Sequence, residues 1–296
     1  MVAGALTGAM LALSVTRAAA DPESTSESKQ PVTVSSDREL ESVTVEAQRE
    51  RITKQVSQFV TSIVLPARHE SLARWQVPIC LGVAGLPPTG NEFVKKRISQ
   101  IAADSGVPLG SQGCAFNFVV VVTSDPETLL KEWWAADPRL FNRDRGVGGV
   151  KRLISAELPV RVWYNACSVA PGLAKHFEMS GYARCNTGEL GSRLTWGSVR
   201  TIYSVIEVVD LEHIVGLTYG QVADYVSMVG LAQIRENPEL GDAPTILGLF
   251  AQGSADRPEA LSHFDQAFLR SVYESTVGNV TELAQIKLRM GQDLLR

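Results

Sequence analysis

Histidine is scarce in this chain of 296 residues, which has only His69, His176, His213 and His263. A zinc-binding catalytic helix needs two His four positions apart, with Glu directly after the first. Glu70 does follow His69, but Ala73 stands where the second ligand is required. The sequence therefore predicts no metal site, and nothing in it indicates a cofactor.

Other signatures are missing as well. No apolar run reaches the roughly 20 residues that span a bilayer, so we expect no transmembrane segment. A net charge of −4 argues against a nucleic-acid partner. No G-x-S-x-G motif is present, and the glycine-rich segment 146–149 follows charged residues rather than a strand, which favours a flexible loop. With 45% apolar and 20% charged residues, the chain has the composition of an ordinary globular protein.

The N-terminus carries a run of uncharged, mostly apolar residues, Val2 to Val15, followed by Thr16-Arg17 and then three alanines. This pattern is typical of a secretory signal peptide, residues 1–20, cleaved after Ala20. A buried Ala-rich helix is the alternative. Residues 21–42 are rich in Ser, Glu, Asp and Pro, which predicts a disordered linker. We therefore expect a periplasmic or secreted protein.

The four cysteines support export. Their even number and the absence of C-x-x-C spacing favour two disulfides in an oxidising compartment. Three pairings can be drawn, and we favour the two in which each pair flanks one local unit, Cys80–Cys114 and Cys167–Cys185. Four buried free thiols are the alternative.

Residues 43–296 are predicted to form a single α+β domain. Its first half alternates strands and helices, which favours a mixed sheet with crossover helices between parallel neighbours. Asn91 is expected to cap one helix and Ser124-Asp125-Pro126 to start the next. The C-terminal half reads as helical, over 219–233, 245–250, 262–274 and 281–295. Strands are expected at 77–83, 116–123, 158–164 and 199–209, and a further helix at 49–64.

The predicted helix from Val222 to Gln233 carries Asp224 and Gly230 at a spacing of six, and 262–273 reads S-x-x-D…L-Y in outline. On these residues the C-terminal half resembles the metzincin branch of zinc metallopeptidases, with its HExxHxxGxxH helix. The resemblance implies a zincin-like fold. It also implies that the zinc ligands are replaced, by Ala223, Ser227 and Gln233, and that Asp224 stands at the place of the catalytic Glu.

Two interpretations of this helix stay open. One is a metallopeptidase-like scaffold without metal, in which Ser227 and Gln233 line a binding cleft. The other is an amphipathic core helix whose Asp224 faces water.

The segment from Glu41 to Glu50 contains Val43-Thr44-Val45 and resembles the TonB box of outer-membrane receptors. The resemblance implies a docking strand that would add to an envelope protein partner. An ordinary strand leading into the first helix is the alternative.

The wider pattern is similar to uncharacterised exported proteins of Gram-negative bacteria, through Val43-Thr44-Val45, Pro78-Ile79-Cys80 and Gly113-Cys114. The sequence as a whole favours a non-catalytic binding or adaptor protein of the cell envelope. A hydrolase using Asp224 with Tyr225, and a purely structural envelope component, are the competing hypotheses.

Overall fold

The computed structural model describes residues 34–64, 71–141, 146–170, 198–251, 257–278 and 281–296. The chain divides into two units, Met1–Thr44 and Val45–Arg296, and the second contains the β-sheet. The helices are α1 (Val34–Ile63), α2 (Pro88–Asp104), α3 (Pro126–Ala136), α4 (Gly146–Ser155), α5 (Tyr219–Leu231), α6 (His263–Glu274) and α7 (Glu282–Leu294). The strands are β1 (Arg74–Trp75), β2 (Leu81–Ala84), β3 (Phe118–Thr123), β4 (Val160–Val169) and β5 (Val199–Asp210).

The five strands form one mixed sheet, as the sequence predicts. Strand β5 lies in the middle: its C-terminal part pairs in parallel with β3, and its N-terminal part pairs in parallel with β1. On the other side β4 pairs with β5 antiparallel, with a register shift between Asn165 and Ala166. Strand β2 pairs in parallel with β3, and α2 makes the crossover between them.

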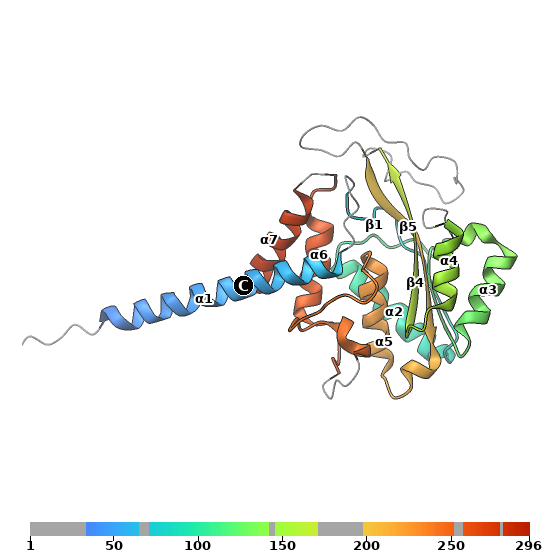
Figure 1. Cartoon of the computed structure of the whole chain (residues 1–296), viewed down its shortest axis with the longest axis horizontal. Helices are drawn as coiled ribbons and strands as arrows, with labels where there is room; N and C mark the ends of the chain where they lie inside the picture. The colour runs from blue at the N-terminus through green and yellow to red at the C-terminus, as the bar shows by residue number, and fades with distance from the viewer. Residues whose placement is uncertain (1–33, 65–70, 142–145, 171–197, 252–256, 279–280) are drawn as a thin grey trace, which may run out of the picture. The chain divides into compact units, whose positions relative to one another are not determined.

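Helices cover both faces of the sheet (Figure 1). Helices α2 and α5 lie on one face and share a large core with β3, α6 and the C-terminal part of α1. Helices α3 and α4 lie on the other face, over a smaller core that includes Trp163 of β4 and Val208 of β5. The α+β class is confirmed, with the helices of the second half stacked outside α5.

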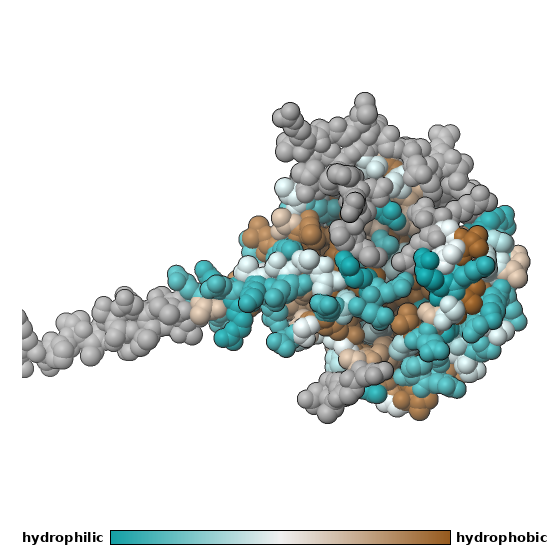
Figure 2. All heavy atoms as spheres, in the orientation of Figure 1, coloured by the Kyte–Doolittle hydropathy of each residue, from teal (hydrophilic) through white to brown (hydrophobic). Residues whose placement is uncertain are grey.

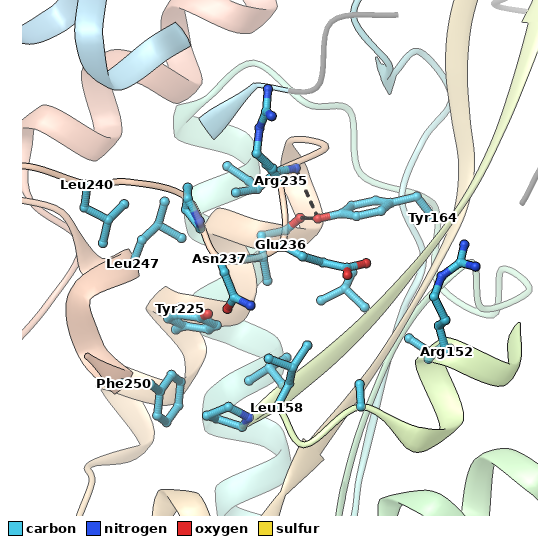
Figure 3. A pocket seen from close by; sticks show the side chains of 18 of the residues that line it. Arg152, Leu158, Tyr164, Tyr225, Arg235, Glu236, Asn237, Leu240, Leu247 and Phe250 are labelled. Carbon is cyan, nitrogen blue, oxygen red and sulfur yellow. Dashed lines mark hydrogen bonds between the residues drawn. The ribbon is translucent and has the colours of Figure 1, made fainter. Parts of the chain in front are cut away.

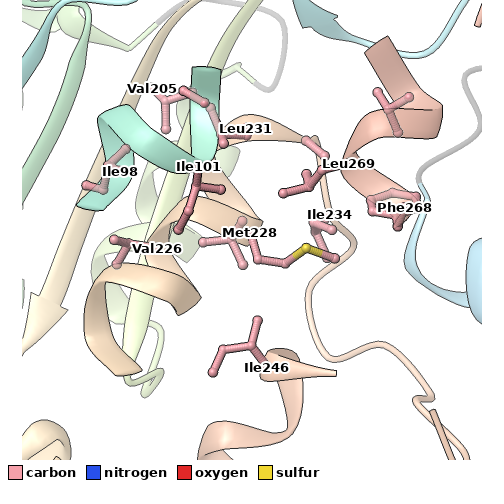
Figure 4. Close-up of a cluster of buried hydrophobic side chains, with 14 of the residues drawn as sticks. Ile98, Ile101, Val205, Val226, Met228, Leu231, Ile234, Ile246, Phe268 and Leu269 are labelled. Carbon is pink, nitrogen blue, oxygen red and sulfur yellow. The ribbon is translucent and has the colours of Figure 1, made fainter. Parts of the chain in front are cut away.

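The large core is dominated by aliphatic residues from elements far apart in the sequence (Figure 4). Ile98 and Ile101 of α2 meet Val226 and Met228 of α5, while Phe268 approaches from α6. Phe59 of α1 packs edge-on against Phe264 and Phe268, so the end of α1 belongs to this core. Burial on this scale rigidly positions α5, the helix on which most of the predicted site residues lie.

Helix starts follow the local chemistry that the sequence contains. Asp125 caps α3 by accepting from the Thr128 N–H, and Pro126 occupies the first turn. Thr218 with Gln221 and Ser262 with Asp265 form capping boxes at α5 and α6. The helix start expected at Ser262 is therefore confirmed.

Three local predictions are wrong. Asn91 does not cap α2, which begins at Pro88; its side chain instead bonds the backbone N–H and C=O of Leu86. Segment 146–149 is the first turn of α4 rather than a loop, because Val150, Leu153 and Ile154 bury one side of that helix. Helix α1 begins at Val34, so its first turns occupy residues expected to be linker.

Cys80 and Cys114 form a disulfide, as predicted. Cys167 is also disulfide-bonded, whereas its predicted partner Cys185 lies outside the described residues, as does the predicted cleavage site after Ala20. Within the described part of the chain, no helix combines the length and apolar character that a membrane span requires.

Candidate ligand-binding site

A cavity of about 470 Å³ lies beside α5, where β4, the end of α4 and segment 234–251 meet (Figure 3). This volume falls within the range of small-molecule sites in proteins. Most of its lining residues are aliphatic or aromatic, and six carry polar side-chain groups. The lining consists of Gly149, Arg152, Leu153, Ala156, Leu158, Pro159, Val160, Val162, Tyr164, Tyr225, Val229, Ile234, Arg235, Glu236, Asn237, Pro238, Leu240, Leu247, Phe250 and Ala251.

Two tyrosines give the wall its hydroxyl groups. Tyr164 of β4 is fully engaged: its hydroxyl donates to the Val229 carbonyl at 2.6 Å and accepts from the Ile234 N–H at 3.3 Å. Tyr225 of α5 packs edge-on against Phe250, with ring centroids 4.8 Å apart. Burial, and secondarily the nearby Glu207 carboxyl, raise the pKa of Tyr225 to about 12, so its hydroxyl stays protonated at neutral pH.

The charged groups of the cavity stand on its rim. Arg152 comes from α4, whereas Arg235, Glu236 and Asn237 follow α5 (Figure 3). Segment 234–237 is tied to the end of α1, because the Arg235 backbone N–H donates to the Ile63 carbonyl at 2.7 Å and its guanidinium to the Val64 carbonyl at 3.2 Å. Asn237 has a φ of 50°, a left-handed conformation that asparagine tolerates better than most residues.

Behind the wall, Glu207 of β5 is completely buried, and neither carboxyl oxygen has a hydrogen-bond partner within the described residues. It lies directly opposite Val162 of the cavity wall in the β4–β5 register. Desolvation raises the pKa of Glu207 well above its usual value, because burial disfavours the ionised carboxylate. Burial thus favours the uncharged form of the one acid behind the wall.

Gly230 explains how α5 approaches the sheet so closely. A Cβ at this position would clash with the Phe118 ring and with the Glu207 carboxyl, so only glycine fits. Its carbonyl accepts from the Trp75 indole N–H at 2.9 Å. The glycine that supports the metzincin resemblance thus has a packing role in this fold.

Asp224 lies away from the cavity and is 1% exposed, not facing water as the core-helix interpretation expects. The Arg97 guanidinium of α2 binds both of its oxygens, at 2.6 and 2.9 Å, and the Leu261 N–H donates to one of them at 2.6 Å. Such a bidentate pair fixes two helices to each other. Tyr225, its neighbour in the sequence, points into the cavity instead, so the structure does not bring the two candidate catalytic residues together.

Ser227 and Gln233 do not form the predicted cleft. Ser227 is fully buried, and its hydroxyl donates to the Ala223 carbonyl at 2.7 Å, one turn back on α5. Gln233 is half-buried in a different place, a crevice of about 10 Å³ beside Phe268 and Val272. The two residues do not share an opening, because Ser227 faces the core from within α5 whereas Gln233 lies beyond the end of that helix.

Val43, Thr44 and Val45 lie inside α1, which corrects the prediction of an extended docking strand. Val45, whose side chain is described, is 43% exposed. Backbone groups within a helix are paired along the helix and cannot add to the edge of a partner's sheet. In this structure the three residues are therefore not in the extended conformation that the TonB-box resemblance implies.

Of the histidines, His213 makes an ion-pair contact with Asp210 at 3.2 Å just after β5. The described residues contain no group of three or more His, Cys, Asp and Glu side chains arranged to hold a metal ion. Glu207 was not among the residues that sequence reasoning selected; the available signal was a single acid within the apolar run VIEVV.

Comparisons with known proteins do not place the chain in a family: no protein-family model, no curated protein and no solved structure matches it.

Proposed function

We propose that this protein is a non-catalytic binding protein that is exported to an oxidising compartment of the cell envelope. The observation that carries the binding role is the cavity beside α5, a preformed site with an apolar wall and a polar rim. Its described lining contains no Ser, Thr, Cys, Lys or His; the groups there that can act as nucleophiles are Glu236 and the two tyrosines, and the Tyr164 hydroxyl is already hydrogen-bonded. These residues support binding more directly than catalysis.

The competing hypothesis, a hydrolase that uses Asp224, has weaker support. A general base needs a lone pair that can reach the substrate. Both oxygens of Asp224 instead accept hydrogen bonds from Arg97, and one also accepts from the Leu261 backbone. The carboxylate holds the fold together and does not line the cavity.

Export is supported by the Cys80–Cys114 disulfide together with the uncharged stretch that begins the sequence. Fractionation of cells that express the full chain, followed by N-terminal sequencing of the mature protein, tests this part. We expect the mature chain outside the cytoplasm, beginning at Asp21. A cytoplasmic protein with an intact N-terminus would contradict export.

Binding is tested by screening a fragment library by NMR against the ¹⁵N-labelled protein and two variants. Leu158→Trp places an indole in the lining of the cavity, whereas Leu288→Trp adds the same group at an exposed position on α7. We expect hits that shift resonances of the cavity lining and are lost only in Leu158→Trp. A screen without cavity hits, or hits that Leu158→Trp retains, would refute the proposed site.

A further inference from the structure

Resting on that proposed function, we infer that the cavity beside α5 takes an amphipathic organic anion: an apolar acyl or aromatic body inside the cavity, and one anionic group held at the rim by Arg152. The inference follows from how polarity is distributed over the lining, which differs sharply between interior and rim.

The interior favours an apolar body. Leu247, Phe250 and the Tyr225 ring form one wall, and Val160 and Val162 of β4 form the other. The polar hydroxyl of Tyr164 is already bonded to the Val229 carbonyl and offers a ligand little. Burying apolar ligand surface against such a wall is favourable by about 25 cal/mol for each Å² removed from water.

One hydrogen-bond donor in the interior is available. The Tyr225 hydroxyl has no hydrogen-bond partner among the described residues, although the ring is half-buried. Buried tyrosine hydroxyls normally find a partner. A polar atom of the ligand that reaches below the rim would satisfy this donor, which adds orientation to an otherwise apolar interior.

The rim favours an anion. The lining includes Arg152, Arg235 and one acid, Glu236, and the Arg235 guanidinium is turned to the Val64 carbonyl, which leaves Arg152 as the cation at the mouth. The Arg152 guanidinium forms no ion pair within the described part of the chain, and Glu236 already has an interaction of its own. A guanidinium binds carboxylate and phosphate oxygens through two parallel N–H groups, so an unpaired arginine at the mouth of an apolar cavity is well suited to an anionic head group.

The uncharged wall strengthens the argument. The charged lining residues are exposed ones, and desolvation raises the pKa of the one acid behind the wall, Glu207, which favours its uncharged form. An ionic group placed deep inside would lose its hydration without finding a counter-ion, whereas at the rim it keeps contact with water and meets Arg152. The ligand's charge therefore belongs at the rim and its apolar body inside.

The test uses three probes with the same eight-carbon body: octanoate, octan-1-ol and octylammonium. Binding to the oxidised full-length protein is measured by titration calorimetry and by shifts of cavity resonances in NMR. We expect octanoate to bind roughly 3- to 10-fold more tightly than octan-1-ol, with octylammonium weakest, a size appropriate to a partly exposed charge contact.

Two variants that lose the same charge one residue apart provide the control. Arg152 lines the cavity, while Lys151 lines a different groove between α3 and α4. Arg152→Gln should remove most of the preference for octanoate and leave octan-1-ol binding unchanged. Lys151→Gln should change neither.

The outcomes separate the two proposals. Equal binding of octanoate and octan-1-ol, or an octanoate affinity that Arg152→Gln leaves intact, would overturn the anion inference while the binding site stands. Tighter binding of octylammonium would overturn it as well. If fragments bind but no eight-carbon probe does, the ligand class is wrong. If neither fragments nor probes shift any cavity resonance, the proposed function falls too.

Discussion

Glu207 makes the pH dependence of this protein's stability predictable. The carboxyl is fully buried in β5 without a hydrogen-bond partner among the described residues, and its pKa is raised by desolvation. Between the pKa of an unfolded glutamate, about 4.3, and its own higher pKa, the folded protein holds a proton that the unfolded chain releases. Stability that is fully present below about pH 4 is therefore lost as pH rises.

Replacing Glu207 by methionine isolates this effect, since methionine has a similar unbranched shape and no titratable group. At acidic pH the free energy of unfolding of the variant should exceed that of the wild type by about 1–3 kcal/mol, because a buried polar group without a partner is removed. Above pH 5 the advantage should grow by up to about 1.4 kcal/mol per pH unit, while the wild-type carboxyl stays protonated.

The assay is urea unfolding of the oxidised protein at pH 4, 5, 6, 7 and 8 and constant ionic strength. Taking the difference between wild type and variant cancels the groups that both proteins share. Glu212→Met, which removes an acid from the exposed turn after β5, is the control and should show no comparable trend. A difference that does not change with pH would refute the reasoning, because it would mean that Glu207 is ionised in the folded state.

Three further substitutions test contacts that hold the fold together, each by chemical denaturation. Glu282→Gln breaks the buried ion pair between Glu282 and Arg74, an arginine whose pKa is lowered to about 10 by burial. The substitution should lower the free energy of unfolding by roughly 3–5 kcal/mol, and a loss below about 1 kcal/mol would show that the pair is dispensable. Gly230→Ala should lower the free energy of unfolding by about 1–3 kcal/mol, because the added methyl group clashes with the Phe118 ring and the Glu207 carboxyl. No change in stability would mean that α5 can move away from the sheet. Asp224→Asn weakens the contact with Arg97 and should lower the free energy of unfolding by about 1–3 kcal/mol. It should not change hydrolysis in a broad substrate panel, and a specific loss of turnover would support the hydrolase hypothesis.

Much of the fold could be predicted because its signals are local. The β-branched run of β3 predicts a strand, and the capping residues Asp125 and Ser262 predict helix starts, each from a few neighbouring residues. Helix α4 was missed because three of its first four residues are glycines, which lower helix propensity. Packing of its apolar side against the sheet outweighs that local preference.

The site could not be predicted in the same way, because its parts are distant in the sequence. Arg152 and Tyr225 are separated by 73 positions and share a cavity only through the pairing of β4 with β5. Asp224 and Tyr225 show the converse: as neighbours on a helix, they point in directions about 100° apart, so one ties α5 to α2 and the other faces the cavity.

The Cys80–Cys114 link, with a sequence separation of 34, closes a covalent ring that contains β2 and α2 and ends just before β3. By the chain-entropy relation, such a ring disfavours the unfolded chain by about 4 kcal/mol, a large share of the 5–15 kcal/mol that usually separates folded from unfolded protein. The thiol–disulfide balance of the surroundings thus affects the stability of the chain: newly made chains in which Cys80 and Cys114 are still thiols would unfold more readily and be easier for proteases to degrade than the oxidised protein.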